Sequence, residues 1–276
     1  MSGDVVGADE SDPSFSVETE TDLDRVVESR LDDRLHSKAL RWRPPDGFKG
    51  RKTVNEVLDK PTIMTLYKMI SAGTVSGVEG AVGAGKESLL FRGVREGAPD
   101  LALKVYLVST SNFKKRADYI RGDPRFSRFR KNTRDLVYLW AQKEFRNLRQ
   151  SFEAGVRVPR PVRVANNVLA MEFVGSGGRP APLMLHSHAD GEDYRQVLEM
   201  MGTLYTKAGL VHGDCSEYNI FKFGEGLVLF DLGSAVDRRH PAAGAFLRRD
   251  INNINRFFRR RGVAVRDLND ILGDME

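Results

Sequence analysis

Cysteine is almost absent from this chain, since Cys215 is the only one among 276 residues. A single cysteine excludes a disulfide framework and any zinc or iron–sulfur site built from several cysteines. Long apolar runs are also missing, and none approaches the roughly 18 residues that a membrane-spanning helix needs. The first residues, Met1–Asp4, contain neither the basic stretch nor the apolar core of a secretory signal. We therefore expect a soluble, cytoplasmic protein.

Apolar residues are sufficient for a packed core. They make up 41% of the chain and charged residues 29%, and this balance excludes disorder of the whole chain. At roughly 150 residues per domain, the length predicts two compact units or one domain of two lobes.

Charge is unevenly distributed along the chain. Residues 1–40 carry eleven Asp and Glu against four Lys and Arg, although the net charge of the chain is +5. Residues 109–134 contain nine Lys and Arg against two Asp, and residues 238–261 contain eight Arg against Asp250 alone. Such clusters are typical of surfaces that contact polyphosphates or nucleic acid, although an ordinary solvated surface has the same composition. The first cluster also contains aromatic residues that could stack on unpaired bases, which favours RNA: Phe113, Tyr119, Phe126 and Phe129.

The hydrophobic pattern changes along the chain. Residues 1–21 are acidic and lack an apolar period, so we expect a disordered tail. Residues 22–76 predict a helical extension, in which Pro61 divides a helix over 53–70. Residues 77–85 are glycine-rich. The remaining predicted elements are strands at 88–94 and 101–108, a helix over 134–154 that ends at Gly155, a hairpin of 162–165 and 168–174, a helix over 193–208, strands at 220–223 and 227–230, and a helix over 242–261. This order predicts an α+β fold with two lobes.

A glycine-rich stretch, Gly80–Lys86, matches the first seven positions of a P-loop. The eighth position must be Ser or Thr to hold Mg²⁺, but Glu87 stands there, and residues 88–94 predict a strand where a P-loop would open a helix. The P-loop interpretation is therefore disfavoured. Glycines between two strands are also typical of the flexible lid of protein kinases, whose backbone N–H groups approach phosphates, although an ordinary turn has the same pattern.

The strongest signal is His212–Asn219, with the sequence HGDCSEYN, followed by Asp231 in an Asp-Leu-Gly motif. Asp214 and Asn219 are close enough for one loop to present a carboxylate and an amide to the same cavity. The strand pair that follows can return Asp231 to it. Phosphoryl transfer needs such a set, because a carboxylate must accept or orient the attacking hydroxyl and oxygen ligands must hold Mg²⁺ against the phosphates. The joint pattern predicts a phosphotransferase.

Lys104 lies in an otherwise hydrophobic strand, where burial of an unpaired ammonium would cost several kcal/mol. Glu144 on the long helix and ATP phosphates are candidate partners, and the alternative is a lysine that reaches water at the strand edge. Met171, Glu172 and Val174 close the hairpin at the usual position of a kinase hinge. There the Glu172 carbonyl and the Val174 N–H would bind adenine, and Met171 would guard the deeper pocket.

These motifs, taken in order, make the chain resemble the RIO atypical protein kinases, and within them the type 1 branch, over about residues 55–262. The segments that carry the resemblance are Lys60–Thr62, Met64–Lys68, Gly85–Glu87, Ala102–Tyr106, Trp140–Leu148, His212–Asn219, His240–Ala242 and Phe246–Asp250. The basic insert between Lys104 and Glu144 is also similar to the flexible loop of that branch.

The resemblance implies a bilobal protein-kinase-like fold. Its small N-lobe, an antiparallel sheet, would span 77–174 with the basic flexible loop 109–134, and its reduced, mainly helical C-lobe would span 175–276. Too little chain follows Gly233 for an activation loop and peptide-binding helices, and RIO kinases lack both.

The resemblance also implies ATP and Mg²⁺ as cofactors, with Mn²⁺ as a substitute. Asp214 would be the proton acceptor, Asn219 and Asp231 would bind the metal, and Asp231 could become an aspartyl-phosphate in an ATPase cycle. The residues expected to bind the nucleotide are Gly85, Lys86, Lys104, Glu144, Met171, Glu172 and Val174.

The expected biological role is serine autophosphorylation and maturation of the small ribosomal subunit, whose precursor rRNA would contact the loop 109–134. One departure from the family is Gly83-Ala84, which replaces a usual Ser-Thr and removes two hydroxyl contacts to phosphate. Two alternatives share parts of the pattern. One is a small-molecule kinase of the aminoglycoside or choline type, which normally has a larger helical lobe. The other is an ATP-gated, RNA-binding assembly factor with negligible transferase activity.

Overall fold

A computed structural model describes the protein at residues 58–85, 87–108, 119–120, 122–126 and 132–275, all within one compact unit, Arg41–Glu276. Four predicted features lie wholly or largely outside the described residues: the tail 1–21, residues 22–57 of the extension, Lys86 and most of the loop 109–134. The expectations for them remain predictions.

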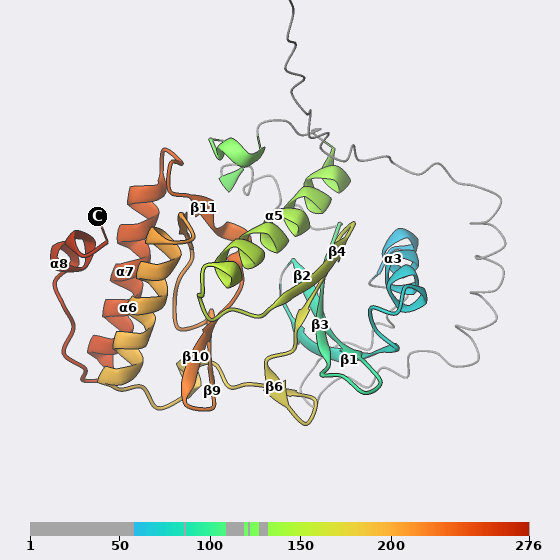
Figure 1. Ribbon diagram of the computed structural model, residues 1–276, viewed down its shortest axis with the longest axis horizontal. Helices are drawn as coiled ribbons and strands as arrows, with labels where there is room; N and C mark the ends of the chain where they lie inside the picture. The colour runs from blue at the N-terminus through green and yellow to red at the C-terminus, as the bar shows by residue number, and fades with distance from the viewer. Residues whose placement is uncertain (1–57, 86, 109–118, 121, 127–131, 276) are drawn as a thin grey trace, which may run out of the picture. The chain divides into compact units, whose positions relative to one another are not determined.

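Five antiparallel strands form one sheet in the order β1-β2-β3-β5-β4 (Figure 1). Their bounds are β1 Gly77–Ala84, β2 Ser88–Val94, β3 Leu101–Tyr106, β4 Pro161–Ala165 and β5 Val168–Glu172. Every residue of β3 is buried, because successive side chains point to opposite faces of the sheet and both faces are covered. Leu103 and Val105 pack with helix α3, whereas Ala102 and Tyr106 join the larger core.

Helix α3, Lys60–Ser71, covers one face of this sheet. Asp59 caps it, since its Oδ1 accepts a hydrogen bond from the Thr62 amide at 3.1 Å. Pro61 lies in the first turn, where its missing N–H would have no partner within the helix. The second piece of the predicted stretch 53–70 is confirmed as α3, which begins at Lys60–Pro61, whereas the first piece lies mostly outside the described residues and stays a prediction.

Helix α5, Thr133–Glu153, lies between the sheet and the C-terminal half of the chain (Figure 1). It contacts β4, β5 and the 3₁₀ turn η4, Leu232–Ser234. Asn132 caps its first turn by accepting a hydrogen bond from the Asp135 amide at 2.7 Å. Gly155, with φ 84°, follows its last turn, so the glycine ends the helix as its position in the sequence predicts.

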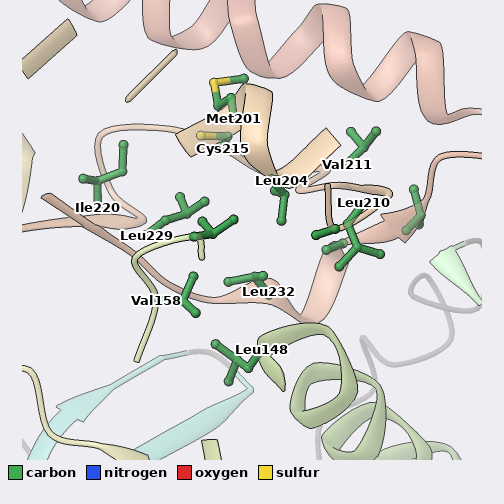
Figure 2. Close-up of a cluster of buried hydrophobic side chains, with 14 of the residues drawn as sticks. Leu148, Val158, Met201, Leu204, Leu210, Val211, Cys215, Ile220, Leu229 and Leu232 are labelled. Carbon is green, nitrogen blue, oxygen red and sulfur yellow. The ribbon is translucent and has the colours of Figure 1, made fainter. Parts of the chain in front are cut away.

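The C-terminal half is mainly helical. Its helices are α6 Gly191–Thr206, α7 Ala243–Arg260 and α8 Leu268–Gly273. Short strands pair as β6 Gly175–Ser176 with β7 Arg179–Pro180, β8 Leu210–Val211 with β11 Val236–Asp237, and β9 Ile220–Phe223 with β10 Gly226–Leu229. Two further 3₁₀ turns are η2 Pro124–Phe126 and η3 Met184–His186. Leu148 of α5 packs in the same apolar core as Met201 of α6 and Leu229 (Figure 2).

A short connection joins η4 to α7, and it holds only β11 and a turn. It leaves no room for an activation loop, and α7 and α8 complete the described chain. The predicted fold class is therefore confirmed: an α+β, bilobal kinase-like fold with a small antiparallel sheet, a reduced helical half and no activation loop. None of the helices in the described residues is long and apolar enough to cross a membrane.

Part of the basic segment 109–134 packs onto the fold. Tyr119 stacks on Phe246 of α7 with ring centroids 5.2 Å apart, and Phe126 is buried in the core. The prediction that these two aromatic residues present surfaces for base stacking is therefore wrong. The sequence could not separate the two roles, because an aromatic side chain among arginines can equally anchor its segment to a core.

Leu103→Ala tests the packing between the sheet and α3. Leu103 is fully buried there, so the substitution removes buried carbon atoms and leaves a cavity, and we expect unfolding to become easier by about 2–5 kcal/mol. Urea unfolding followed by circular dichroism measures this change. Ile70→Ala, at an exposed position of α3, is the control and should change stability by no more than about 0.5 kcal/mol. Equal losses in both variants would contradict this packing.

Candidate active site

A pocket opens between the sheet and the helical half. The turn between β1 and β2 and the strands β2 and β3 form one side, residues around the end of β5 form another, and residues near β9 and β10 form a third. The pocket is lined by Gly83, Ala84, Gly85, Ser88, Leu90, Ala102, Lys104, Glu144, Pro159, Met171, Glu172, Phe173, Val174, Pro180, Phe221, Phe230 and Asp231. Seven of the ten predicted site residues are among them. Of the other three, Lys86 lies outside the described residues, and Asp214 and Asn219 lie on an adjoining loop.

Lys104 joins two carboxylates beside this pocket. Its Nζ lies 2.9 Å from each carboxylate oxygen of Glu144 and 2.9 Å from Oδ1 of Asp231. Lys104 extends from β3 and Glu144 from α5, so the ion pair connects the helix to the sheet. The Glu144 side chain is completely buried, whereas that of Asp231 is 49% exposed. Two carboxyl groups therefore share one ammonium.

Burial and charge oppose each other in this cluster. Burial alone would lower the pKa of Lys104, but Asp231 and Glu144 raise that pKa above its ordinary value and keep the ammonium protonated. Burial raises the pKa of Glu144 to about 7, against the pull of Lys104 and with the help of the Asp231 charge. A cation bound beside Asp231 would reduce the repulsion between the two carboxylates.

Asp231 has a left-handed backbone conformation, with φ 60° and ψ 59°. For a residue other than glycine, such a conformation stores about 1–3 kcal/mol of strain and persists only where its surroundings hold it. The surroundings in question are the turn η4, which begins at the next residue, and the helix α5 against which that turn packs.

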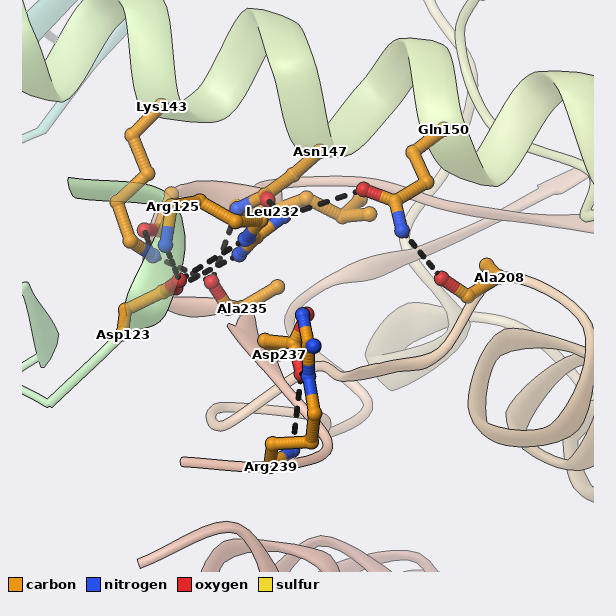
Figure 3. Close-up of polar contacts among 11 residues, drawn as sticks. Asp123, Arg125, Lys143, Asn147, Gln150, Ala208, Leu232, Ala235, Asp237 and Arg239 are labelled. Carbon is orange, nitrogen blue, oxygen red and sulfur yellow. Dashed lines mark hydrogen bonds and ion pairs between the residues drawn. The ribbon is translucent and has the colours of Figure 1, made fainter. Parts of the chain in front are cut away.

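Two side chains of α5 hold the turn η4. Lys143 donates hydrogen bonds to the carbonyl of Gly233 at 2.9 Å and to that of Ala235. Asn147 donates to the carbonyls of Leu232 at 2.8 Å and Ala235 at 2.9 Å. Both side chains are completely buried and lie one helical turn apart, on the same face of α5 (Figure 3).

Gly233 permits this close approach. A Cβ atom at Gly233 would lie 2.8 Å from Nε1 of Trp140 and 3.2 Å from Oε2 of Glu144. A larger residue would therefore push α5 away from the turn and disturb the carboxylate that Lys104 contacts.

The loop 212–219 is tied to the end of β10. His212 Nε2 lies 3.0 Å from the Phe230 carbonyl, and its Nδ1 accepts a hydrogen bond from the Asp214 amide at 3.3 Å. Because a carbonyl oxygen can only accept, Nε2 is the ring nitrogen that donates to Phe230. Asn219 Nδ2 donates to the Asp214 carbonyl at 2.8 Å, and the Phe230 amide donates to the Asn219 carbonyl at 3.0 Å. These bonds bring Asp214 and Asn219 next to the residue that precedes Asp231.

The pKa of the Asp214 carboxyl group is shifted by its burial and by these neighbours. Partial burial raises its pKa above the ordinary value, His212 opposes this effect and the charge of Asp231 adds to it. Because Asp214 is solvent-exposed, water reduces the shift. The carboxyl group of Asp214 is thus reachable from solvent, beside the loop that His212 and Asn219 hold.

The oxygen atoms at this end of the pocket fit a hard divalent cation. Asp231 offers a half-exposed carboxylate, and Asn219 uses its Nδ2 on the Asp214 carbonyl, so its Oδ1 is the atom suited to ligation. The described part of the chain contains no group of three or more His, Cys, Asp and Glu that could enclose a metal alone. Mg²⁺ ordinarily takes one or two protein carboxylates together with phosphate oxygens and water. This incomplete donor set fits a metal that arrives with a nucleotide.

Three side chains of helix α7 form hydrogen bonds with the backbone of the loop 212–219. The fully buried Asp250 accepts hydrogen bonds from the amides of Gly213 at 2.7 Å and Cys215 at 3.0 Å. Arg249 donates to the Gly213 carbonyl, and Asn253 donates to the Cys215 carbonyl at 3.3 Å. Burial raises the pKa of Asp250 to about 6. The peptide groups on both sides of the expected proton acceptor are thus fixed by one helix.

The segment at the predicted hinge, 171–174, is anchored on its outer side. The Glu172 amide donates to the Arg160 carbonyl at 2.8 Å, and the Arg160 amide donates to Oε2 of Glu172 at 3.1 Å. Gly175 follows, and a Cβ there would lie 2.1 Å from the carbonyl oxygen of Arg179, so glycine alone fits.

The glycine-rich segment forms a hairpin. β1 and β2 pair with register shifts on either side of Ala81, and the Gly85 amide donates to the Ser88 carbonyl at 2.8 Å to close the turn. A strand and not a helix follows, so the rejection of a P-loop is confirmed.

Several residues that build this site were missed from the sequence. Lys143 and Asn147 lie in the family segment Trp140–Leu148, which gives them no role, although polar residues at helical spacing beside Glu144 are a usable signal. Asp250 lies in the family segment Phe246–Asp250 and is the one acid of a basic cluster, and neither observation assigns it a role. Phe221 and Phe230, which stack in the pocket wall with centroids 4.0 Å apart, flank the strand pair between Asn219 and Asp231.

Asp250→Ala tests the support from α7. It leaves two buried amide groups without their acceptor, so we expect a loss of about 2 kcal/mol or more in the free energy of unfolding. Guanidinium unfolding provides the measurement. Asn252→Ala, at an exposed position on the same helix, is the matched control and should leave stability nearly unchanged. A loss no larger than that of the control would show that Asp250 does not hold the loop.

Comparison with known proteins gives the family. Residues 89–271 match the family model described as RIO domain. The RIO-type serine/threonine-protein kinase Rio1 of Haloferax volcanii is 37% identical over 89% of this chain and 83% of its own length. The protein of the same name from Methanocaldococcus jannaschii is 40% identical over 84% of this chain and 80% of its own. The human serine/threonine-protein kinase RIO1 is 37% identical over 90% of this chain, but over 44% of its own length.

Solved structures agree on the fold. The Rio2 kinase–ADP/Mg²⁺–phosphoaspartate complex from Chaetomium thermophilum superposes with a TM-score of 0.61 at 21% identity, covering 90% of this chain and 75% of that one. The names of the relatives favour a protein kinase over a small-molecule kinase. The match over 89–271 and relatives at 37–40% identity show that this chain belongs to the RIO family of serine/threonine-protein kinases.

Proposed function

We propose that this kinase binds ATP with Mg²⁺ in the pocket between its two halves, and that Asp214 and Asp231 carry out the chemistry. The observation that supports this most is the Lys104 ammonium, which lies 2.9 Å from both Glu144 and Asp231 at the pocket wall. A phosphate chain placed beside Asp231 would find this cation within reach, and phosphoryl transfer relies chiefly on such positioning and charge stabilisation.

The proposed nucleotide orientation follows from the lining. Phe221 and Phe230 provide apolar surface for adenine, beside the backbone of Met171–Val174. The phosphates would then extend under the turn at Gly85, with Lys86 as a further cation in the proposal. The metal, Mg²⁺ or Mn²⁺, would be held by Asp231 and Asn219 and would neutralise charge on the phosphates.

On the kinase route, a serine or threonine hydroxyl oxygen bonds to the γ-phosphorus while the bond between that phosphorus and the bridging oxygen to the β-phosphate breaks. ADP is the leaving group. The hydroxyl proton passes to the carboxylate of Asp214, which the loop 212–219 and helix α7 hold in place. Autophosphorylation on serine is the same reaction with a hydroxyl of this chain.

On the ATPase route, a carboxylate oxygen of Asp231 bonds to the γ-phosphorus and ADP leaves. No proton is transferred in this step. Water then attacks the aspartyl-phosphate, with one of its protons passing to Asp214, and inorganic phosphate leaves, which restores the carboxylate of Asp231. The half-exposed Asp231 supports this route, as does the phosphoaspartate in the Rio2 relative's crystal structure.

Labelling with γ-³²P-ATP and Mg²⁺ tests the two routes. We expect hydroxylamine-labile label on the wild-type protein, which identifies an acyl phosphate, and its loss in Asp231→Asn. Asp214→Ala should reduce ATP turnover by roughly 10²-fold or more, the scale of general base catalysis.

The control for both variants is Asp270→Asn, an exposed carboxylate on α8, which should keep label and turnover. Unchanged turnover in Asp214→Ala would contradict its role as proton acceptor. Hydroxylamine-labile label that survives in Asp231→Asn would contradict the aspartyl route, and hydroxylamine-stable phosphoserine alone would leave only the kinase route.

We further propose a cytoplasmic role in maturation of the small ribosomal subunit, with precursor rRNA bound by the basic segment 109–134. Two of its nine basic residues are engaged elsewhere: Arg125 pairs with Asp123, and Arg134 with Asp59. The proposal therefore rests on Lys114, Lys115, Arg116, Arg121, Arg128, Arg130 and Lys131. Helix α7 adds a second basic surface, since its exposed arginines are Arg248, Arg249, Arg256, Arg259 and Arg260.

Replacing those seven residues of the segment by Gln tests RNA binding. We expect weaker binding and a shallower dependence of log affinity on log salt concentration, by about 0.7 for each lost phosphate contact with single-stranded RNA. Filter binding over a series of salt concentrations measures the slope. Arg125 is kept so that the core stays intact. An unaltered slope would show that these seven residues do not contact RNA phosphates.

A further inference from the structure

The turn after Asp231 is connected to the basic segment through one amide of α5 (Figure 3). Asn147 donates both its Nδ2 hydrogen bonds to carbonyls of that turn, while its Oδ1 accepts a hydrogen bond from Nη1 of Arg125 at 2.9 Å. A flip of this amide would place its oxygen against the carbonyls and its N–H₂ against a guanidinium. Arg125 therefore fixes which way Asn147 points.

Arg125 is itself held rigidly. Its Nε lies 2.9 Å from Oδ1 of Asp123 and its Nη2 lies 2.7 Å from Oδ2, a bidentate pair that fixes the plane of the guanidinium. Nη1 also donates to Gln150 at 3.2 Å. The Asp123 carboxylate is completely buried. Burial alone would raise its pKa, but Arg125, with a contribution from Lys143, lowers it and keeps the pair ionised.

Lys143 and Asn147, whose side chains donate to η4, are both linked to Asp123. Lys143, which donates to Gly233 and Ala235, carries a charge that acts on Asp123. Asn147 is oriented by the arginine that Asp123 holds. Residues of the short segment 122–126 thus act on both side chains that hold the backbone after Asp231.

We propose that Arg125 is a positioning residue for Asp231. By orienting Asn147 it keeps the carbonyls of η4 in place, and so holds the left-handed Asp231 with its carboxylate toward Lys104 and the pocket. This inference rests on the proposed function, in which that carboxylate binds the metal. It gives a residue of the basic segment a role in phosphoryl transfer that does not involve RNA.

A merely structural role for Arg125 would have a different consequence. Loss of the ion pair with Asp123 would then lower stability but leave metal binding unchanged. Arg134 provides a matched comparison, because it belongs to the same segment, is also paired with an aspartate, and points to Asp59 before α3 and not to η4. Substituting either arginine by glutamine removes the same charge and one ion pair.

The test measures Mn²⁺ binding to the ADP-bound protein by calorimetry, with ADP binding in the absence of metal as a second readout. In Arg125→Gln we expect Mn²⁺ to bind roughly 10- to 100-fold more weakly, the usual effect of losing a residue that orients a metal ligand. Binding of ADP alone should change by less than about twofold. Arg134→Gln should bind Mn²⁺ as the wild type does.

A double-mutant cycle with Asn147→Ala checks the path. If Arg125 acts through Asn147, the double variant should bind Mn²⁺ about as weakly as Asn147→Ala alone, because the effects of residues in one path are not additive. Arg125→Lys serves if Arg125→Gln does not fold, since lysine keeps the charge but not the planar fork. It should weaken Mn²⁺ binding in the same direction by a smaller factor, about threefold.

Equal Mn²⁺ affinities in the Arg125 and Arg134 variants would overturn the inference and leave the proposed function standing. Additive effects of Arg125→Gln and Asn147→Ala would also overturn it. Asp231→Asn tests separately whether the proposed function itself fails. If that variant bound Mn²⁺ as tightly as the wild type, Asp231 would not be a metal ligand, and both the proposed function and this inference would be contradicted.

Discussion

A single buried ammonium organises the active site of this kinase. Lys104 cannot remain charged inside the sheet without carboxylates, and the two that it contacts come from parts of the chain far apart in sequence. Glu144 brings helix α5 onto the sheet, and Asp231 brings the end of β10 to the same point. Because breaking a buried ion pair leaves an uncompensated charge, the pair fixes how the two halves of the fold meet. The carboxylate of Asp231 is half-exposed beside this pair, which suits a nucleotide-bound metal.

One face of helix α5 carries both residues of the core and residues that contact the candidate active site. Leu148 packs in the C-terminal core, Glu144 pairs with the lysine, and Lys143 and Asn147 hold the turn after Asp231. A left-handed aspartate can persist there because hydrogen bonds from two buried side chains fix the backbone that follows it. Helix α7 does the same for the other loop, since Asp250 binds the amides on both sides of Asp214. Asp214 and Asp231 are thus each held through the peptide groups of their neighbours.

The basic segment 109–134 contains residues of two kinds. Its described part is anchored by Tyr119, Phe126 and the Arg125–Asp123 pair, and only the remaining basic residues are candidates for contact with RNA. Composition treats all nine basic side chains alike, because it counts charge and not the direction in which a charge points. Arg125 pairs with Asp123 and is mostly shielded from solvent, because a buried carboxylate requires a cation and this nearby arginine supplies it.

The sequence by itself determined the fold class and the residue types of the site, because strand and helix periods are local and the HGDxxxxN and Asp-Leu-Gly motifs are short. It also determined that Lys104 needed an anionic partner, since an ammonium in an apolar strand is costly. Only the tertiary structure decided which side chains support those motifs. Lys143, Asn147 and Asp250 act on backbone groups 35 to 92 residues away. Such contacts leave no local pattern, because any buried polar residue at helical spacing looks the same until its partner is known.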